Sequence, residues 1–218
     1  MAKGQLQKHN HPTASAIAIE VGNAITHGLG VALSIAGLVV LIVQAVHRGG
    51  AMRIVTFTIY GSVLILFYLA STLFHSLVFT RAKHVFRIFD HAMIYMLIAA
   101  TYTPYCLVAI KGWLGWTIFG IEWACAIAGI VYKSIWIDRT NWWSTLVYVI
   151  MGWICLAAFW PLWHHLGPTG FGLLLAGGVV FTMGAVLYSI PGKYTHLIWH
   201  VFVMVGTLLM YFSILLFV

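Results

Sequence analysis

Long apolar runs separated by short polar connections dominate the chain. Each run is close to the roughly 20 residues that an α-helix needs to cross the hydrocarbon core of a bilayer. None of the runs alternates between apolar and polar residues as a barrel strand would, and irregular backbone cannot face lipid. The pattern therefore predicts an all-α integral membrane protein, a bundle of seven transmembrane helices. The runs cover approximately residues 24–46, 54–79, 88–110, 113–132, 143–163, 171–188 and 196–217.

Prolines mark places where these helices should bend or end. Pro104 lies inside the third run and is expected to kink it, because proline has no backbone N–H to donate. Pro161 and Pro168 bracket the connection between the fifth and sixth runs, and Pro191-Gly192 marks the turn before the last run. No linker separates one group of runs from another. Residues 1–218 are therefore predicted to form a single domain, of which about residues 1–20 are a polar N-terminal segment.

Composition supports the membrane assignment. Hydrophobic residues make up 62% of the chain and charged residues only 7%, with a mean hydropathy of +1.00. A soluble domain carries about 25% charged residues. The first apolar run is long enough to span a bilayer rather than to be cleaved as a signal peptide. The three cysteines lie inside apolar runs without a CxxC spacing, which favours buried thiols over disulfides or a thiolate metal site.

The basic residues indicate orientation. The net charge is +7, but the Lys and Arg residues are scattered singly between runs, without the basic, aromatic-interleaved stripe of a nucleic-acid-binding protein. Eight lie on the N-terminal side of the predicted bundle and three on the other, so the N-terminus is predicted to be cytoplasmic and the C-terminus outside, in a multi-pass plasma-membrane protein. The eight are Lys3, Lys8, Arg81, Lys83, Arg87, Lys133, Arg139 and Lys193; the three are Arg48, Arg53 and Lys111.

A histidine pair opens the last apolar run. His196 and His200 are four residues apart, so on a helix they share one face and lie roughly 6 Å apart along the axis. One metal ion could take a nitrogen from each. Polar groups are costly where a helix enters lipid, so the pair is a functional-site hypothesis. The alternative is two interfacial histidines that only hydrogen-bond to neighbours.

Three further polar clusters interrupt the apolar runs. Glu20, Asn23 and His27 fall on one face at the head of the first helix, where they form either part of a site or a polar cap. Ser71 and His75 are four apart near the end of the second helix, where the alternative is a packed histidine. Asp90 begins the third helix, where it is either a helix-capping carboxylate or a metal ligand or base.

The predicted topology brings all four clusters to the cytoplasmic leaflet. At the outer ends only Glu122 and His164-His165 are polar. Three histidines and a carboxylate suit zinc, with the fourth coordination position left for water, as in catalytic sites. The predicted ligands are His75, His196 and His200, with Asp90 and Ser71 as catalytic residues. Glu20, Asn23 or His27 could orient a ligand imidazole, and the sequence leaves open which one does so.

Five sequence elements occur in an order that is similar to a known family. Together they resemble the bacterial hemolysin III branch of the progestin and adipoQ receptor (PAQR) family, over nearly the whole chain from about Glu20. The elements are Glu20-x-x-Asn23-x-x-x-His27-x-x-Gly30, Ser71-x-x-x-His75, Asp90, Ala100-Thr101-Tyr102-Thr103-Pro104 and His196-x-x-x-His200.

The resemblance implies a seven-helix bundle with a cytoplasmic N-terminus and a zinc ion held by the three histidines, close to Asp90 and Ser71. It also implies a link to ceramidase-like hydrolysis of lipid amides, which is ascribed to eukaryotic relatives. Bacterial members carry the hemolysin name from a cytolytic, pore-forming activity.

Three functions follow from these residues. The first is a zinc-dependent intramembrane hydrolase of lipid amide or ester bonds, involved in membrane homeostasis, with a membrane lipid as substrate. The second is a pore-forming protein in which zinc is structural, although no helix shows a regular polar row that would line an aqueous path. The third is a non-catalytic sensor with a lipid as ligand. The oligomeric state is not indicated by the sequence.

Overall fold

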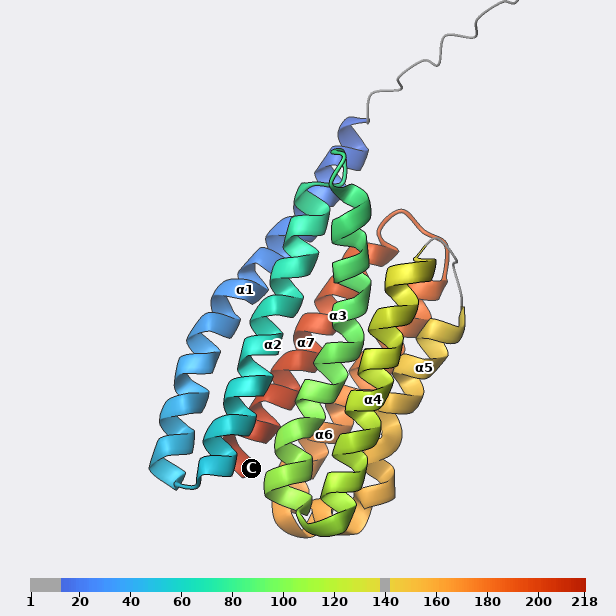
Figure 1. Ribbon diagram of the computed structural model, residues 1–218. Coiled ribbons are helices and arrows are strands. Elements are labelled where there is room, and N and C mark those ends of the chain that lie inside the picture. The colour runs from blue at the N-terminus through green and yellow to red at the C-terminus, as the bar shows by residue number, and fades with distance from the viewer. Residues whose placement is uncertain (1–12, 138–141) are drawn as a thin grey trace, which may run out of the picture.

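The computed structural model of the protein describes residues 13–137 and 142–218, and every regular element within them is helical (Figure 1). The predicted basic residues Lys3, Lys8 and Arg139 and most of the polar N-terminal segment lie outside the described residues. The elements are α1 (Ala14–Arg48), α2 (Ala51–Ser76), α3 (Lys83–Pro104), the π-helix η1 (Tyr105–Ile110), α4 (Gly112–Trp136), α5 (Trp142–Trp153), the 3₁₀-helix η2 (Ile154–Ala158), α6 (Phe159–Ser189) and α7 (Thr195–Phe217).

Six helical segments of the described chain are long and apolar enough to cross a membrane, where the sequence predicted seven. The difference lies in the segment Trp143–Ser189, which merges the fifth and sixth predicted runs into 47 residues. A straight helix of that length would measure about 70 Å, more than twice the hydrocarbon core. Helical geometry breaks at Gly167, where φ is 64°, directly before Pro168. The colours in Figure 1 show the chain running down one side of this break and back up the other.

The first helix begins ten residues earlier than predicted, at Ala14 instead of residue 24. The Thr13 hydroxyl caps it by accepting a hydrogen bond from the Ala16 amide at 3.2 Å. The sequence prediction followed the density of apolar residues and therefore missed a capped but more polar first turn. With 35 residues, α1 is about 50 Å long and exceeds the thickness of a bilayer core.

The predicted breaks elsewhere agree more closely with the structure. Regular α-helical bonding ends at Pro104, after which the chain continues as η1. The second helix ends at Ser76, three residues before the predicted boundary. The turn predicted at Pro191-Gly192 lies between α6 and α7.

Close contacts bring α1, α2 and α7 together, which positions the site. A methyl group at Gly30 on α1 would lie 2.5 Å from the Tyr68 ring on α2, so this position accepts only glycine without a shift of the ring. The Tyr68 hydroxyl is hydrogen-bonded to the Thr207 hydroxyl on α7 at 2.5 Å. In Figure 1 the starts of α1, α3 and α7 and the end of α2 meet at the same end of the bundle, opposite the C-terminus.

Candidate metal centre

Three histidines converge at this end of the bundle. His75 comes from α2, and His196 and His200 come from α7. One ligand nitrogen from each lies within 4.8 Å of the others. The Nε2 atoms of His75 and His196 are 3.1 Å apart, and the His75 and His200 side chains are almost fully buried. Two helices distant in sequence therefore present three potential metal ligands at one point, as the sequence suggested.

The donor set fits a divalent metal ion. Two imidazole nitrogens at the usual zinc–nitrogen distance in a tetrahedral site are about 3.3 Å apart. The separation of 3.1 Å between the nitrogens of His75 and His196 is close to this value. The ligand nitrogen of the third histidine, His200, lies within 4.8 Å of the other two. These three residues could thus hold one metal ion, and three neutral imidazoles leave coordination room for a further ligand.

Glu20 fixes the orientation of His75. A Glu20 carboxylate oxygen lies 2.6 Å from His75 Nδ1, where it accepts the hydrogen bond from the Nδ1–H group. This contact leaves the Nε2 lone pair of His75 directed towards the other two histidines, the tautomer that a metal ligand requires. The amide nitrogen of Asn23 lies 3.5 Å from the same Nδ1 atom. Among the three residues that could orient an imidazole, Glu20 makes the short polar contact.

His27 contacts a different ligand. Its ring stacks on the His200 ring, with centroids 3.7 Å apart and planes inclined by 9°. Both ring nitrogens of His27 and the Nδ1 atom of His200 are buried without a hydrogen-bond partner among the described residues. Buried polar atoms of this kind normally bind water or an ion. His27 therefore packs against the plane of the His200 ring and makes no polar contact with it.

The two predicted catalytic residues lie outside the group of ligand atoms. Ser71 precedes His75 by one helical turn, and its buried hydroxyl has no partner within the described chain. Asp90 is not a member of the histidine group, and its nearest recorded polar contact is His91 Nδ1 at 3.5 Å. However, Asp90 and His196 line the same cavity. Asp90 therefore lies on the wall of a space that reaches one of the three histidines, His196.

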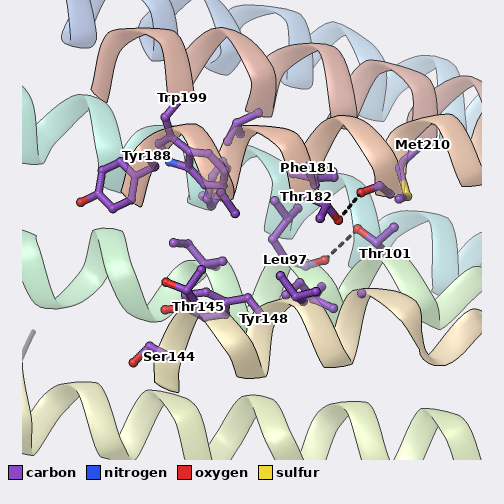
Figure 2. Close-up of a pocket in the computed structure, with 18 of the residues that line it drawn as sticks. Leu97, Thr101, Ser144, Thr145, Tyr148, Phe181, Thr182, Tyr188, Trp199 and Met210 are labelled. Carbon is purple, nitrogen blue, oxygen red and sulfur yellow. Dashed lines mark hydrogen bonds between the residues drawn. The ribbon is translucent and has the colours of Figure 1, made fainter. Parts of the chain in front are cut away.

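This cavity has a volume of about 540 Å³ and extends along the helices. Figure 2 shows Ser144 and Tyr188 near one end and Thr101 and Met210 near the other. Asp90 and Thr101, which both line it, are eleven residues apart on α3, or about 16 Å along the axis. Apolar side chains form much of the wall between the two ends, including Ile94, Leu97, Phe181 and Val203. The cavity thus has polar residues beside His196, and its wall is mainly apolar along its length.

The sequence interpretation missed two buried charged residues on α4. Lys133 was assigned to a cytoplasmic connection, but it lies within α4 and is only 5% exposed. Glu122 was expected at an outer helix end, but it lies near the middle of α4 and is fully buried. A helical spacing of three or four residues could have revealed both. The buried face of α4 consists of Gly115, Ile118, Glu122, Ala126, Gly129 and Lys133.

Comparisons with known proteins agree with this architecture. The family described as "Haemolysin-III related" matches residues 15–211. Hemolysin-3 of Bacillus cereus is 45% identical over 202 residues, which cover 91% of each chain. The Hemolysin-3 homolog of Bacillus subtilis (strain 168) is 46% identical over 199 residues, covering 90% of this chain and 92% of the homolog.

A human relative is more distant. Monocyte to macrophage differentiation factor of Homo sapiens is 25% identical over 201 residues, covering 88% of this chain and 81% of the human protein. The protein is a multi-pass membrane protein, and its bacterial relatives agree with the predicted plasma-membrane location. This chain therefore belongs to the haemolysin-III-related family, within the wider group of PAQR proteins that the sequence motifs indicated.

Proposed function

We propose that this protein is a zinc-dependent hydrolase that cleaves an amide or ester bond of a membrane lipid. The observation that carries this proposal is that His196, one of the three converging histidines, lines a long, mainly apolar cavity whose wall also includes Asp90. A structural metal site would not need an adjoining cavity. A lipid with its acyl chain in the apolar part would bring its first carbonyl group to the polar end.

His75, His196 and His200 would hold the ion. Zinc bound there would supply Lewis-acid chemistry, acidifying water and polarising a carbonyl oxygen. The Asp90 carboxylate acts as the general base and accepts a proton from the attacking water. The Ser71 hydroxyl, which is buried and has no partner among the described residues, donates a hydrogen bond to the oxyanion that forms. Glu20 keeps His75 in the required tautomer.

The proposal includes a topology with seven membrane crossings and a cytoplasmic N-terminus. The break at Gly167 divides the 47-residue segment into two limbs, each of a length that suits a single crossing. The excess of basic residues on the N-terminal side supports the orientation. The histidines and Asp90 would then lie in the inner leaflet, close to cytoplasmic water.

Glu20→Gln is expected to weaken zinc binding about 10- to 100-fold, because the neutral amide accepts a weaker hydrogen bond from His75 and leaves the imidazole less basic. Competition with a chelator of known affinity measures the change in purified protein. Glu122→Gln is the matched control, since it makes the same acid-to-amide change at a residue outside the histidine site. Equal zinc affinities for wild-type protein and Glu20→Gln would contradict the proposed role of Glu20.

A lipid screen tests the proposed activity. Purified zinc-loaded protein in nanodiscs is incubated with ceramide, diacylglycerol and glycerophospholipids, and released fatty acid is measured by mass spectrometry. Fatty acid released above the level given by the metal-free protein is expected for at least one of these lipids. The cavity also supports a second function, binding a lipid without cleaving it. A lipid that co-purifies intact with zinc-loaded protein, with no release from any substrate, would favour that sensor-like function.

A further inference from the structure

Lys133 is a buried cation that the proposed reaction does not use. It lies near the end of α4, is 5% exposed and contributes to the wall of the main cavity. It makes no ion pair or hydrogen bond with any described residue, Asp90 included. Charged residues within membrane helices are costly, and those that face a cavity commonly mark the path or the binding site of a substrate.

Ser144 provides a second polar group on the same cavity. It lies near the start of α5 and is 5% exposed, and its hydroxyl, which neighbours the Tyr95 side chain, makes no close hydrogen bond with a described residue. Tyr148, one turn further along α5, already donates a hydrogen bond to the carbonyl oxygen of His91 at 3.1 Å. Lys133 and Ser144 therefore offer unused donors, an ammonium and a hydroxyl, to whatever occupies the polar end of the cavity.

These donors come from helices that do not carry the histidines. The candidate metal ligands lie on α2 and α7, whereas Lys133 and Ser144 lie on α4 and α5. A ligand that places its scissile carbonyl group beside the histidines would need a second polar group to reach Lys133. A free fatty acid has one polar group, and a neutral ceramide offers only hydroxyl and amide groups. A phosphate head group is anionic, and lysine is a common phosphate-binding residue.

We propose that Lys133 and Ser144 form a head-group subsite that binds the phosphate of a phospholipid. The inference rests on the proposed function for the position of the scissile bond, but phosphate binding does not itself require hydrolysis. Lys133 supplies the positive charge, and the Ser144 hydroxyl donates a hydrogen bond to a phosphate oxygen. The substrate class is then an acidic glycerophospholipid, whose acyl chain occupies the apolar part of the cavity.

Binding of two lipids with the same acyl chains tests this subsite. Dioleoyl phosphatidic acid and dioleoylglycerol are titrated into zinc-loaded Asp90→Asn protein, which removes the proposed general base, and bound lipid is measured by native mass spectrometry. The protein is expected to bind the phosphatidic acid about 10- to 100-fold more tightly than the diacylglycerol, the range for a hydrogen bond to a charged group. Adding Lys133→Gln should abolish this preference, whereas Lys133→Arg should retain most of it.

Lys83→Gln is the matched control. Lys83 is an exposed lysine at the start of α3, at the same end of the bundle, so the substitution removes the same charge outside the cavity. It should leave the lipid preference unchanged. Zinc content and thermal stability are measured for every variant. Should Lys133→Gln fail to fold, Ser144→Ala is an independent test, with an expected loss of about tenfold.

Three results would overturn the inference, and a fourth would separate it from the proposed hydrolase. An unchanged lipid preference in a folded Lys133→Gln protein would do so directly. Binding of inorganic phosphate alone, dependent on Lys133, would indicate a site for a free anion instead of a lipid. Binding of oleate with the same dependence would indicate a carboxylate subsite. Preference for phosphatidic acid that depends on Lys133 in a protein that hydrolyses no lipid would contradict the proposed hydrolase and leave the subsite supported.

Discussion

His196→Ala is expected to reduce bound zinc from about one ion per chain to nearly none and to abolish lipid hydrolysis. The histidine group holds three ligand nitrogens, and the structure offers no described carboxylate within that group to replace the lost one. A two-histidine site retains too few protein ligands for a stable tetrahedral zinc centre. Elemental analysis of purified protein measures the metal, and the lipid screen measures the activity.

Thermal unfolding in detergent gives a second measure of the same change. A ligand that binds only the folded protein raises its melting temperature, so chelation of zinc should lower the melting temperature of the wild-type protein. The chelator should have little effect on His196→Ala. The matched control is His164→Ala, which removes an exposed histidine outside the histidine group. Full zinc content in His196→Ala would show that the three histidines do not form the metal site.

Asp90→Asn is expected to lower the rate of lipid hydrolysis about 10²- to 10⁴-fold while zinc stays bound. This range corresponds to the loss of a general base. Asp90 faces the cavity beside His196 but does not belong to the group of ligand atoms, so its loss should not release the ion. Asparagine keeps the shape of the side chain but cannot accept the proton. Product release under saturating lipid, together with elemental analysis of the same sample, tests both parts of the prediction.

The matched control for this variant is again Glu122→Gln, an acid-to-amide change in a buried residue that does not line the cavity. It should retain both zinc and activity. A loss of zinc in Asp90→Asn would identify Asp90 as a metal ligand, and an unchanged rate would exclude it as the base.

The sequence determined the class of structure because apolar length and helical period depend only on neighbours along the chain. Runs of about 20 apolar residues require membrane-spanning helices. The four-residue spacing of His196 and His200 places both on one face of α7. Gly167 and Pro168 interrupt the long segment where the sequence placed a connection. The ordered polar motifs were sufficient to identify the family before any distance was known.

Only the tertiary structure decided which faces meet, because the rotation and depth of each helix depend on packing between helices. Contacts such as that between Gly30 and Tyr68 set the rotation and depth of α1 and α2. They determine that Glu20 contacts His75 and that His27 stacks on His200 instead. The same dependence on packing explains why the sequence interpretation misplaced Lys133. Lys133 resembles a cytoplasmic anchor until neighbouring helices bury it in the wall of the cavity.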